Sequence, residues 1–131
     1  MKKSALLNSD LSAVIARMGH DDMLVIGDAG LPIPDGPQRI DLALSRGVPG
    51  FIETLRAVLS EMQVERVIIA QETERVSPEI LQQIRQLIGE TPVEWFSHEE
   101  FKQRTAFARA AVRTGEFTPF ANIILIAGVV F

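Results

Sequence analysis

The sequence contains no cysteine and only two histidines, His20 and His98. Without cysteine the chain can form no disulfide, no thiolate nucleophile and no cysteine-based zinc site, which fits a reducing compartment. Two histidines alone would supply a transition-metal site poorly, so we expect no metal ion.

Runs of positive charge are absent as well. The net charge is −4 with no run of Lys or Arg, which argues against nucleic acid or an anionic membrane surface as partner. The apolar part of the N-terminal segment is too short for a signal sequence. The most apolar stretch, residues 123–131, is far below the length that spans a bilayer. We therefore expect no membrane partner and a cytoplasmic location.

Common catalytic motifs are also missing. There is no phosphate-binding P-loop and no nucleophile elbow, and residues 27–30 lack the glycine spacing of a dinucleotide-binding loop. Residues 98–102 begin like the helix motif of zinc proteases, but Lys102 stands where the second histidine should be.

The composition that remains is that of one globular domain over residues 1–131, with 47% hydrophobic and 23% charged residues. Strand and helix patterns alternate, which predicts a three-layer α/β/α fold with a central, mostly parallel or mixed sheet. Strands are expected at 23–27, 39–44, 64–70, 93–96 and 122–131, the last lying centrally in the sheet or covered by another subunit. Helices are expected from Asn8 or Ser9 to a left-handed Gly19, at 51–62, from Ser77 to Gly89, and from the capping box at Ser97 to Gly115.

The stretch at residues 19–34 concentrates polar groups around a short buried strand. His20 precedes the strand and Asp28 follows it, at the strand end where open α/β sheets usually bind ligands. The glycine and prolines of residues 29–34 restrict the loop that follows. We interpret this loop, with an acid at its root, as a pocket wall.

Five polar residues at element ends are candidates for a site, and each has an alternative explanation. His20 could interact with the C-terminal dipole of the first helix, and Asp28 could be a turn residue that bonds its own backbone. His98 and Lys102 could lie on an exposed first turn of a helix. Asn122 could satisfy a neighbouring loop.

Several motifs together resemble the ribose pyranase/fucose mutarotase family. They are residues 19–34, R-I-D-L-A-L with G-V-P at 39–49, E-M-Q-V-E at 61–65, H-E-E-F-K at 98–102 and T-P-F-A-N-I-I-L at 118–125. The resemblance implies a cytoplasmic, cofactor-free isomerase that interconverts the pyranose and furanose forms of a monosaccharide, D-ribose above all. It also implies a homo-oligomer, a decamer of two five-membered rings, with sites near subunit boundaries.

The resemblance also assigns roles to residues. His20 matches the family's catalytic acid, and Asp28, His98 and the segment Phe120-Ala121-Asn122 match sugar-binding positions, with Lys102 nearby. The family usually has Tyr where this chain has Phe120, so a hydroxyl is missing, which would weaken binding by about 1 kcal/mol if that hydroxyl bonds the sugar. This departure bears on substrate preference.

The chemistry of ring opening suits histidine. Opening a cyclic sugar needs an acid at the ring oxygen and a base at the anomeric hydroxyl, and imidazole exchanges protons near neutral pH. We predict that His20 protonates the ring oxygen, and that Asp28 binds hydroxyls or orients the imidazole. His98, Lys102 and Asn122 would hold the remaining hydroxyls.

The separation of His20 and Asp28 along the chain limits how the two residues can share a site. If residues 20–28 were one straight strand, His20 and Asp28 would lie roughly 26 Å apart and could not share one sugar. Either the backbone bends before Met23, or a neighbouring subunit supplies one residue, and we favour the shared pocket. Two rivals remain: a sugar-binding module without catalysis, and a purely structural ring-forming protein.

Overall fold

The sheet consists of six strands in the order β2-β5-β1-β6-β3-β4. In the computed structural model, which describes residues 1–131, β6 runs antiparallel to both of its neighbours and the other pairs are parallel. The fold is therefore a mixed sheet, as predicted. The strands are β1 (Met23–Gly27), β2 (Gln38–Asp41), β3 (Val64–Ala70), β4 (Val93–Phe96), β5 (Ala110–Arg113) and β6 (Ile123–Ala127).

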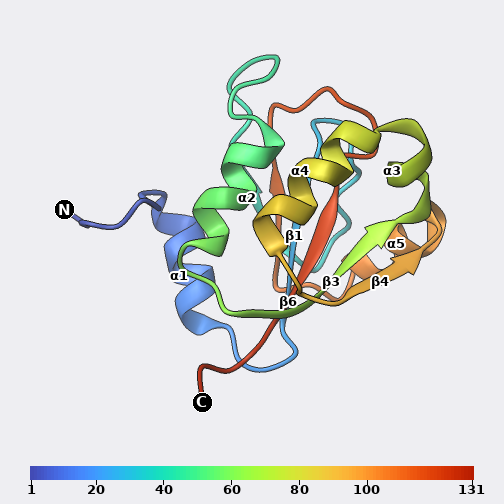
Figure 1. Cartoon of the computed structure of the whole chain (residues 1–131). Coiled ribbons are helices and arrows are strands. Elements are labelled where there is room, and N and C mark those ends of the chain that lie inside the picture. Colours follow the sequence, from blue (N-terminus) through green and yellow to red (C-terminus); the bar gives the residue numbers. More distant parts are fainter.

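Helices cover both faces of the sheet (Figure 1). One face packs against three helices in a core of 22 buried residues, and the other packs against a single helix and Leu31 in a core of nine. This confirms the predicted α/β/α layering. The three helices of the first layer are α1 (Ser9–Arg17), α2 (Phe51–Leu59) and α4 (Pro78–Ile88); α5 (His98–Thr105) lies on the second face, and the short α3 (Gln71–Val76) directly follows β3.

The local signals in the sequence account for most helix boundaries. The side chain of Asn8 accepts a hydrogen bond from the Leu11 N–H at the start of α1, and Ser97 forms the predicted capping box with Glu100 before α5. Gly89 ends α4 with a φ of 57°, which glycine adopts without strain.

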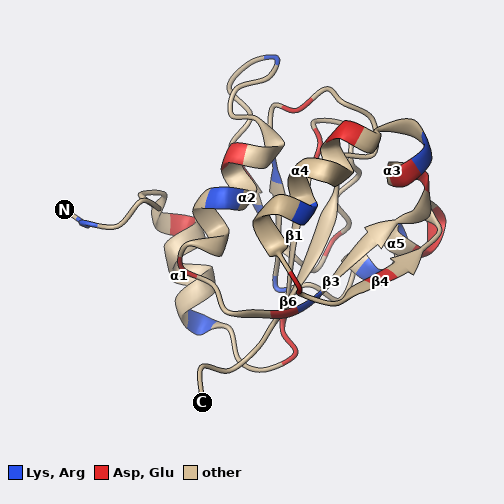
Figure 2. Cartoon of the chain, viewed as in Figure 1, with Lys and Arg blue, Asp and Glu red and all other residues tan.

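The two central strands, β1 and β6, have buried residues on both faces. The last strand thus lies centrally, as predicted, but it ends at Ala127, so that residues 129–131 are exposed. No helix is long and apolar enough to cross a membrane. Figure 2 shows acidic and basic residues interspersed along the helices and loops.

Several predicted boundaries were wrong. The helix that begins after Ser97 ends at Thr105 rather than near Gly115, because Ala110–Arg113 form β5, which pairs with both β1 and β2. A short apolar run is ambiguous between helix and strand, and here strand pairing decided it. The prediction also missed α3, and it extended α2 and β2 about three residues too far.

The end of the first helix also differs from the prediction. Met18 caps α1 in an extended conformation, and the left-handed residue is Asp21 (φ 68°) instead of Gly19. The N–H of Gly19 donates to the Asp22 side chain (2.8 Å), and this bond shapes the turn before β1.

Candidate functional site

The carboxyl ends of the parallel strands converge with the beginning of β6, because β6 runs in the opposite direction. Asp28 follows β1, His98 lies two residues after β4, and Asn122 directly precedes β6. Three residues distant in sequence therefore reach one edge of the sheet, where α/β folds place their ligands.

A reciprocal pair of hydrogen bonds joins Asp28 to Asn122. The Asp28 N–H donates to Asn122 Oδ1 (2.8 Å), and Asn122 Nδ2 donates to Asp28 Oδ2 (3.1 Å). Burial raises the pKa of Asp28 above its usual range, although hydrogen bonds from Gly30 and Asn122 oppose the shift. A carboxylate with a raised pKa is a stronger base than an ordinary aspartate.

His98 presents a nitrogen that has no protein partner. Its Nδ1 is buried and without a hydrogen bond, whereas its backbone N–H donates to the Glu72 carboxylate (3.0 Å). The imidazole meets the ring of Phe120 edge-on, with 4.9 Å between centroids. A buried polar atom without a partner needs one from elsewhere, and a ligand hydroxyl would provide it.

The backbone at Phe120 is held in an unusual conformation. Its φ of 59° is left-handed, which is uncommon for a bulky residue. The Thr73 hydroxyl donates to the Phe120 carbonyl (2.9 Å), and the Ser77 hydroxyl donates to the Pro119 carbonyl (2.6 Å). The predicted N-cap Ser77 thus uses its side chain to hold the turn and makes no side-chain capping bond.

An open hollow of about 400 Å³ adjoins Asp28. The start of the predicted pocket wall lines one side, and the β5–β6 connection lines the other. Its lining residues are Asp28, Ala29, Gly30, Arg113, Glu116, Phe117, Thr118 and Pro119.

Glu116 fixes the β5–β6 connection. Its carboxylate accepts hydrogen bonds from the Phe51 N–H (3.0 Å) and the Thr118 hydroxyl (2.8 Å). Burial works against the charged form, but these hydrogen bonds outweigh it and lower the pKa of Glu116. No local pattern predicted the supporting roles of Glu116, Glu72, Thr73 and Ser77, since only the folded chain brings them to this edge.

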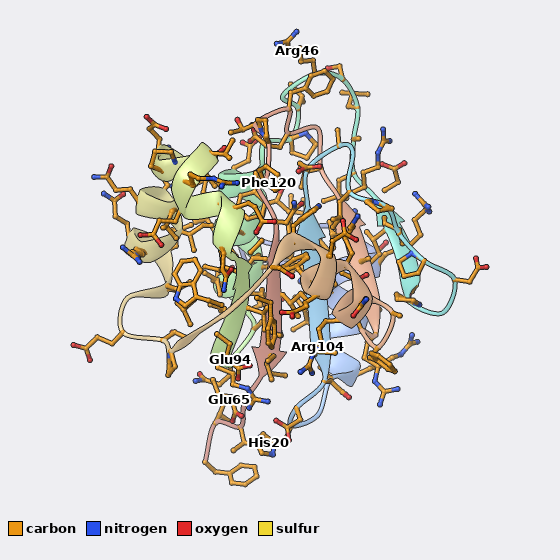
Figure 3. The ribbon with its side chains drawn as sticks, turned by 90° about the vertical axis from the view of Figure 1, so that its right-hand side faces the viewer. His20, Arg46, Glu65, Glu94, Arg104 and Phe120 are labelled. Carbon is orange, nitrogen blue, oxygen red and sulfur yellow. The ribbon has the colours of Figure 1, made fainter.

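His20 lies at the opposite end of the sheet. It precedes β1, its side chain is 54% exposed, and Nε2 lies 2.9 Å from Glu65 Oε2. Figure 3 shows His20 and Phe120 at opposite ends of the molecule. Within one chain the structure brings together Asp28, His98, Phe120, Ala121 and Asn122, but not His20.

Lys102 lies one turn beyond His98 on α5. Its ammonium group pairs with Glu99 (2.7 Å) on the same helix. Lys102 lies in the last turn of α5 and is half-buried, so the alternative explanation of an exposed first turn does not describe it, and it makes no hydrogen bond to the other predicted site residues.

One edge of the mixed sheet thus carries a carboxylate, an amide, an imidazole nitrogen without a protein partner and an aromatic ring. This fold and these groups suit a protein that binds small, hydroxyl-rich ligands. Residues 1–130 match the RbsD / FucU transport protein family. The chain belongs to this family.

Relatives of known name cover the whole chain. D-ribose pyranases from Clostridium perfringens (strain 13 / Type A) and Chloroflexus aggregans are each 60% identical over 131 residues, the full length of both chains. The structure of Bacillus subtilis RbsD complexed with D-ribose is 50% identical, with a TM-score of 0.96 and full coverage of both chains. The fucose mutarotase of Streptococcus pneumoniae in complex with L-fucose is 28% identical, with a TM-score of 0.78 over 95% of this chain and 94% of that one.

Proposed function

We propose that this protein is a cofactor-free isomerase that interconverts the pyranose and furanose forms of D-ribose. The observation that carries the proposal is the group formed by Asp28, His98, Phe120 and Asn122 at one edge of the sheet. It offers acceptors, donors and a ring face to a small polyol, in a chain 60% identical to D-ribose pyranases over its full length.

Each residue of the proposed site has its own role in the reaction. His20 gives a proton to the ring oxygen during opening and recovers it on closure. Asp28, with its raised pKa, accepts the proton of the anomeric hydroxyl or binds hydroxyls of the sugar. His98 and Asn122 hold further hydroxyls, and Phe120 contacts the apolar face of the sugar without the hydroxyl that a tyrosine would add.

The distance between His20 and the other residues supports a site shared by two subunits. His20 lies at the amino end of β1 and Asp28 at its carboxyl end, so a second copy must bring its His20 to the Asp28 edge of the first. Such a head-to-tail contact is heterologous, and repeated copies of it form a ring where the rotation between copies closes. The family resemblance implies a decamer of two five-membered rings, and a site shared between copies supports our proposal of such a homo-oligomer. The cytoplasmic location stays a prediction.

Magnetisation-exchange NMR on D-ribose tests the proposal directly. The wild-type protein should speed pyranose–furanose exchange, and His20→Ala should lower this acceleration by about 100-fold, the usual contribution of one acid–base group. Parallel measurements on L-fucose separate ring-size exchange from exchange of anomers alone.

A second function, binding of the sugar without catalysis, is favoured by the description of the family as transport proteins. Titration of the same samples with D-ribose distinguishes the two. Saturable binding by a wild-type protein that leaves the exchange rate unchanged would contradict the isomerase.

A further inference from the structure

A second polar cluster lies at the amino end of the sheet, around His20. His20 Nε2 and Glu65 Oε2 are 2.9 Å apart, and the other oxygen of Glu65 accepts a hydrogen bond from Arg66 Nη1 (2.7 Å). Arg66 Nε in turn lies 2.9 Å from Glu94, close enough for an ion pair but not aligned as a hydrogen bond. Figure 3 shows His20, Glu65 and Glu94 together at this end.

An irregularity in β3 turns Glu65 toward His20. Val64 pairs with Ala127 and Arg66 pairs with Ile126, so Glu65 is an extra residue in this strand. Such bulges redirect a side chain and are common next to active sites. A Cβ at Gly128 would lie 3.0 Å from the Cβ of Glu65, so glycine leaves room for Glu65 here.

The turn that carries His20 is fixed to the same end of β6. The Asp21 N–H donates to the Ala127 carbonyl (3.0 Å), and the Ala127 N–H donates to the Asp22 carbonyl (2.8 Å). The left-handed Asp21 completes this turn. The end of β6 thus holds in place both His20, in the turn before β1, and Glu65, in β3.

The contact also determines which nitrogen of His20 is free. An ionised carboxylate only accepts hydrogen bonds, so Nε2 carries the hydrogen that Glu65 accepts, and Nδ1 is left for another partner. The Asp21 carboxylate lies 3.8 Å from the same nitrogen, Nε2.

We propose that Glu65 is a positioning residue for the acid His20, and that Nδ1 is the nitrogen that exchanges the proton with the sugar. This inference rests on the proposed function. In the opening step the bond between the anomeric carbon and the ring oxygen breaks, and the Nδ1 proton moves to that oxygen. The anomeric hydroxyl loses its own proton to the Asp28 carboxylate of the proposed site, and ring closure reverses both transfers. Glu65 stays ionised throughout.

Glu65→Gln and Glu94→Gln form a matched pair of variants. Each removes one carboxylate from the same network, but only Glu65 contacts the imidazole. Glu65→Gln should lower kcat for ribose exchange about fivefold, the scale expected of a half-exposed ion pair, and leave KM within about twofold. Glu94→Gln should leave both constants close to the wild-type values.

The ¹⁵N shifts of the ring nitrogens supply a readout that does not depend on activity. The chain has only two histidines, so His98 serves as an internal reference in the same spectrum. Glu65→Gln should move the Nε2 signal of His20, and Glu94→Gln should leave it in place.

The outcomes separate the two proposals. A wild-type protein that does not accelerate exchange, or a fully active His20→Ala variant, would overturn the proposed catalytic role and the positioning role with it. An active wild type and an inactive His20→Ala, combined with equal kcat values for the two glutamine variants, would overturn only the role of Glu65. So would an Nε2 signal that Glu65→Gln leaves unmoved, or a change in KM alone.

Discussion

Burial of the Asp28 carboxylate costs stability but suits that group to proton transfer. Its carboxylate is largely withdrawn from water, and burial is the main reason that its pKa rises. The hydrogen bonds from Gly30 and Asn122 reduce this cost without removing it. A buried, poorly solvated carboxylate is the kind of group that a proton-transfer site needs.

Linkage gives the sign of the corresponding pH effect. The unfolded Asp28 titrates near 3.8 and the folded one at higher pH, so the folded state binds more protons between the two values. The free energy of unfolding therefore falls as the pH rises through this window. Asp28→Asn should remove this contribution, and it should lower ribose exchange about 100-fold.

Thermal unfolding from pH 3.5 to 7 measures the stability effect. We expect the stability of Asp28→Asn relative to wild type to increase toward pH 7. A relative stability that decreases as the pH rises would contradict the assigned sign.

At the scale of elements, the short helix α3 and the β5–β6 connection act as one unit. Thr73 and Ser77 hold the carbonyls of Phe120 and Pro119, and Glu116 ties the same connection to the start of α2. A left-handed phenylalanine persists only where its surroundings fix it. These bonds thereby place the Phe120 ring beside His98.

Thr73→Val tests this function of α3. Thr73 is fully buried, and valine keeps its shape but leaves the Phe120 carbonyl without its partner. We expect a loss of about 1 kcal/mol in unfolding free energy and roughly fivefold weaker ribose binding.

The control is Thr105→Val, which removes an equally buried hydroxyl that bonds to the Lys102 carbonyl within α5. It should cost similar stability and leave the affinity for ribose unchanged. Equal affinities of the two variants, measured by calorimetry, would show that the turn does not depend on Thr73.

At the scale of the whole molecule, the two polar clusters lie at opposite ends of β1, and exposed apolar residues lie near both. Leu44 and Phe117 are 81% and 57% exposed near the Asp28 end, and Val130 and Phe131 are 87% and 101% exposed where the chain ends beyond β6. Contact between copies would cover such side chains. The exposed residues at both ends of β1 are thus consistent with a site formed between the Asp28 end of one copy and the His20 end of the next.

Co-expression of His20→Ala with Asp28→Asn tests the divided site. In mixed oligomers about a quarter of the contacts would join an intact His20 of one chain to an intact Asp28 of another. We expect exchange activity near that fraction of wild type, whereas each variant alone stays inactive. Sedimentation of the mixture checks the assembly, and an inactive mixed oligomer would place each site within a single chain.

Local sequence rules predicted the strands at 23–27, 64–70 and 93–96 and the caps at Asn8 and Ser97, because these signals act within a few residues. They failed at Ala110–Arg113, where a run of small apolar residues fits either a helix or a strand. Pairing with β1 and β2, far away in the sequence, decided that segment.

The sequence by itself determined the fold class, through the alternation of strand and helix patterns, and the family, through the motifs in which the chain resembles its other members. The tertiary structure alone decided which residues meet. The reversed direction of β6 brings Asn122 to Asp28, and the bulge in β3 turns Glu65 to His20. The length of β1 keeps the Asp28–Asn122 pair apart from the His20–Glu65 pair. Such proximity depends on strand direction and pairing across the sheet, which no local run of residues specifies.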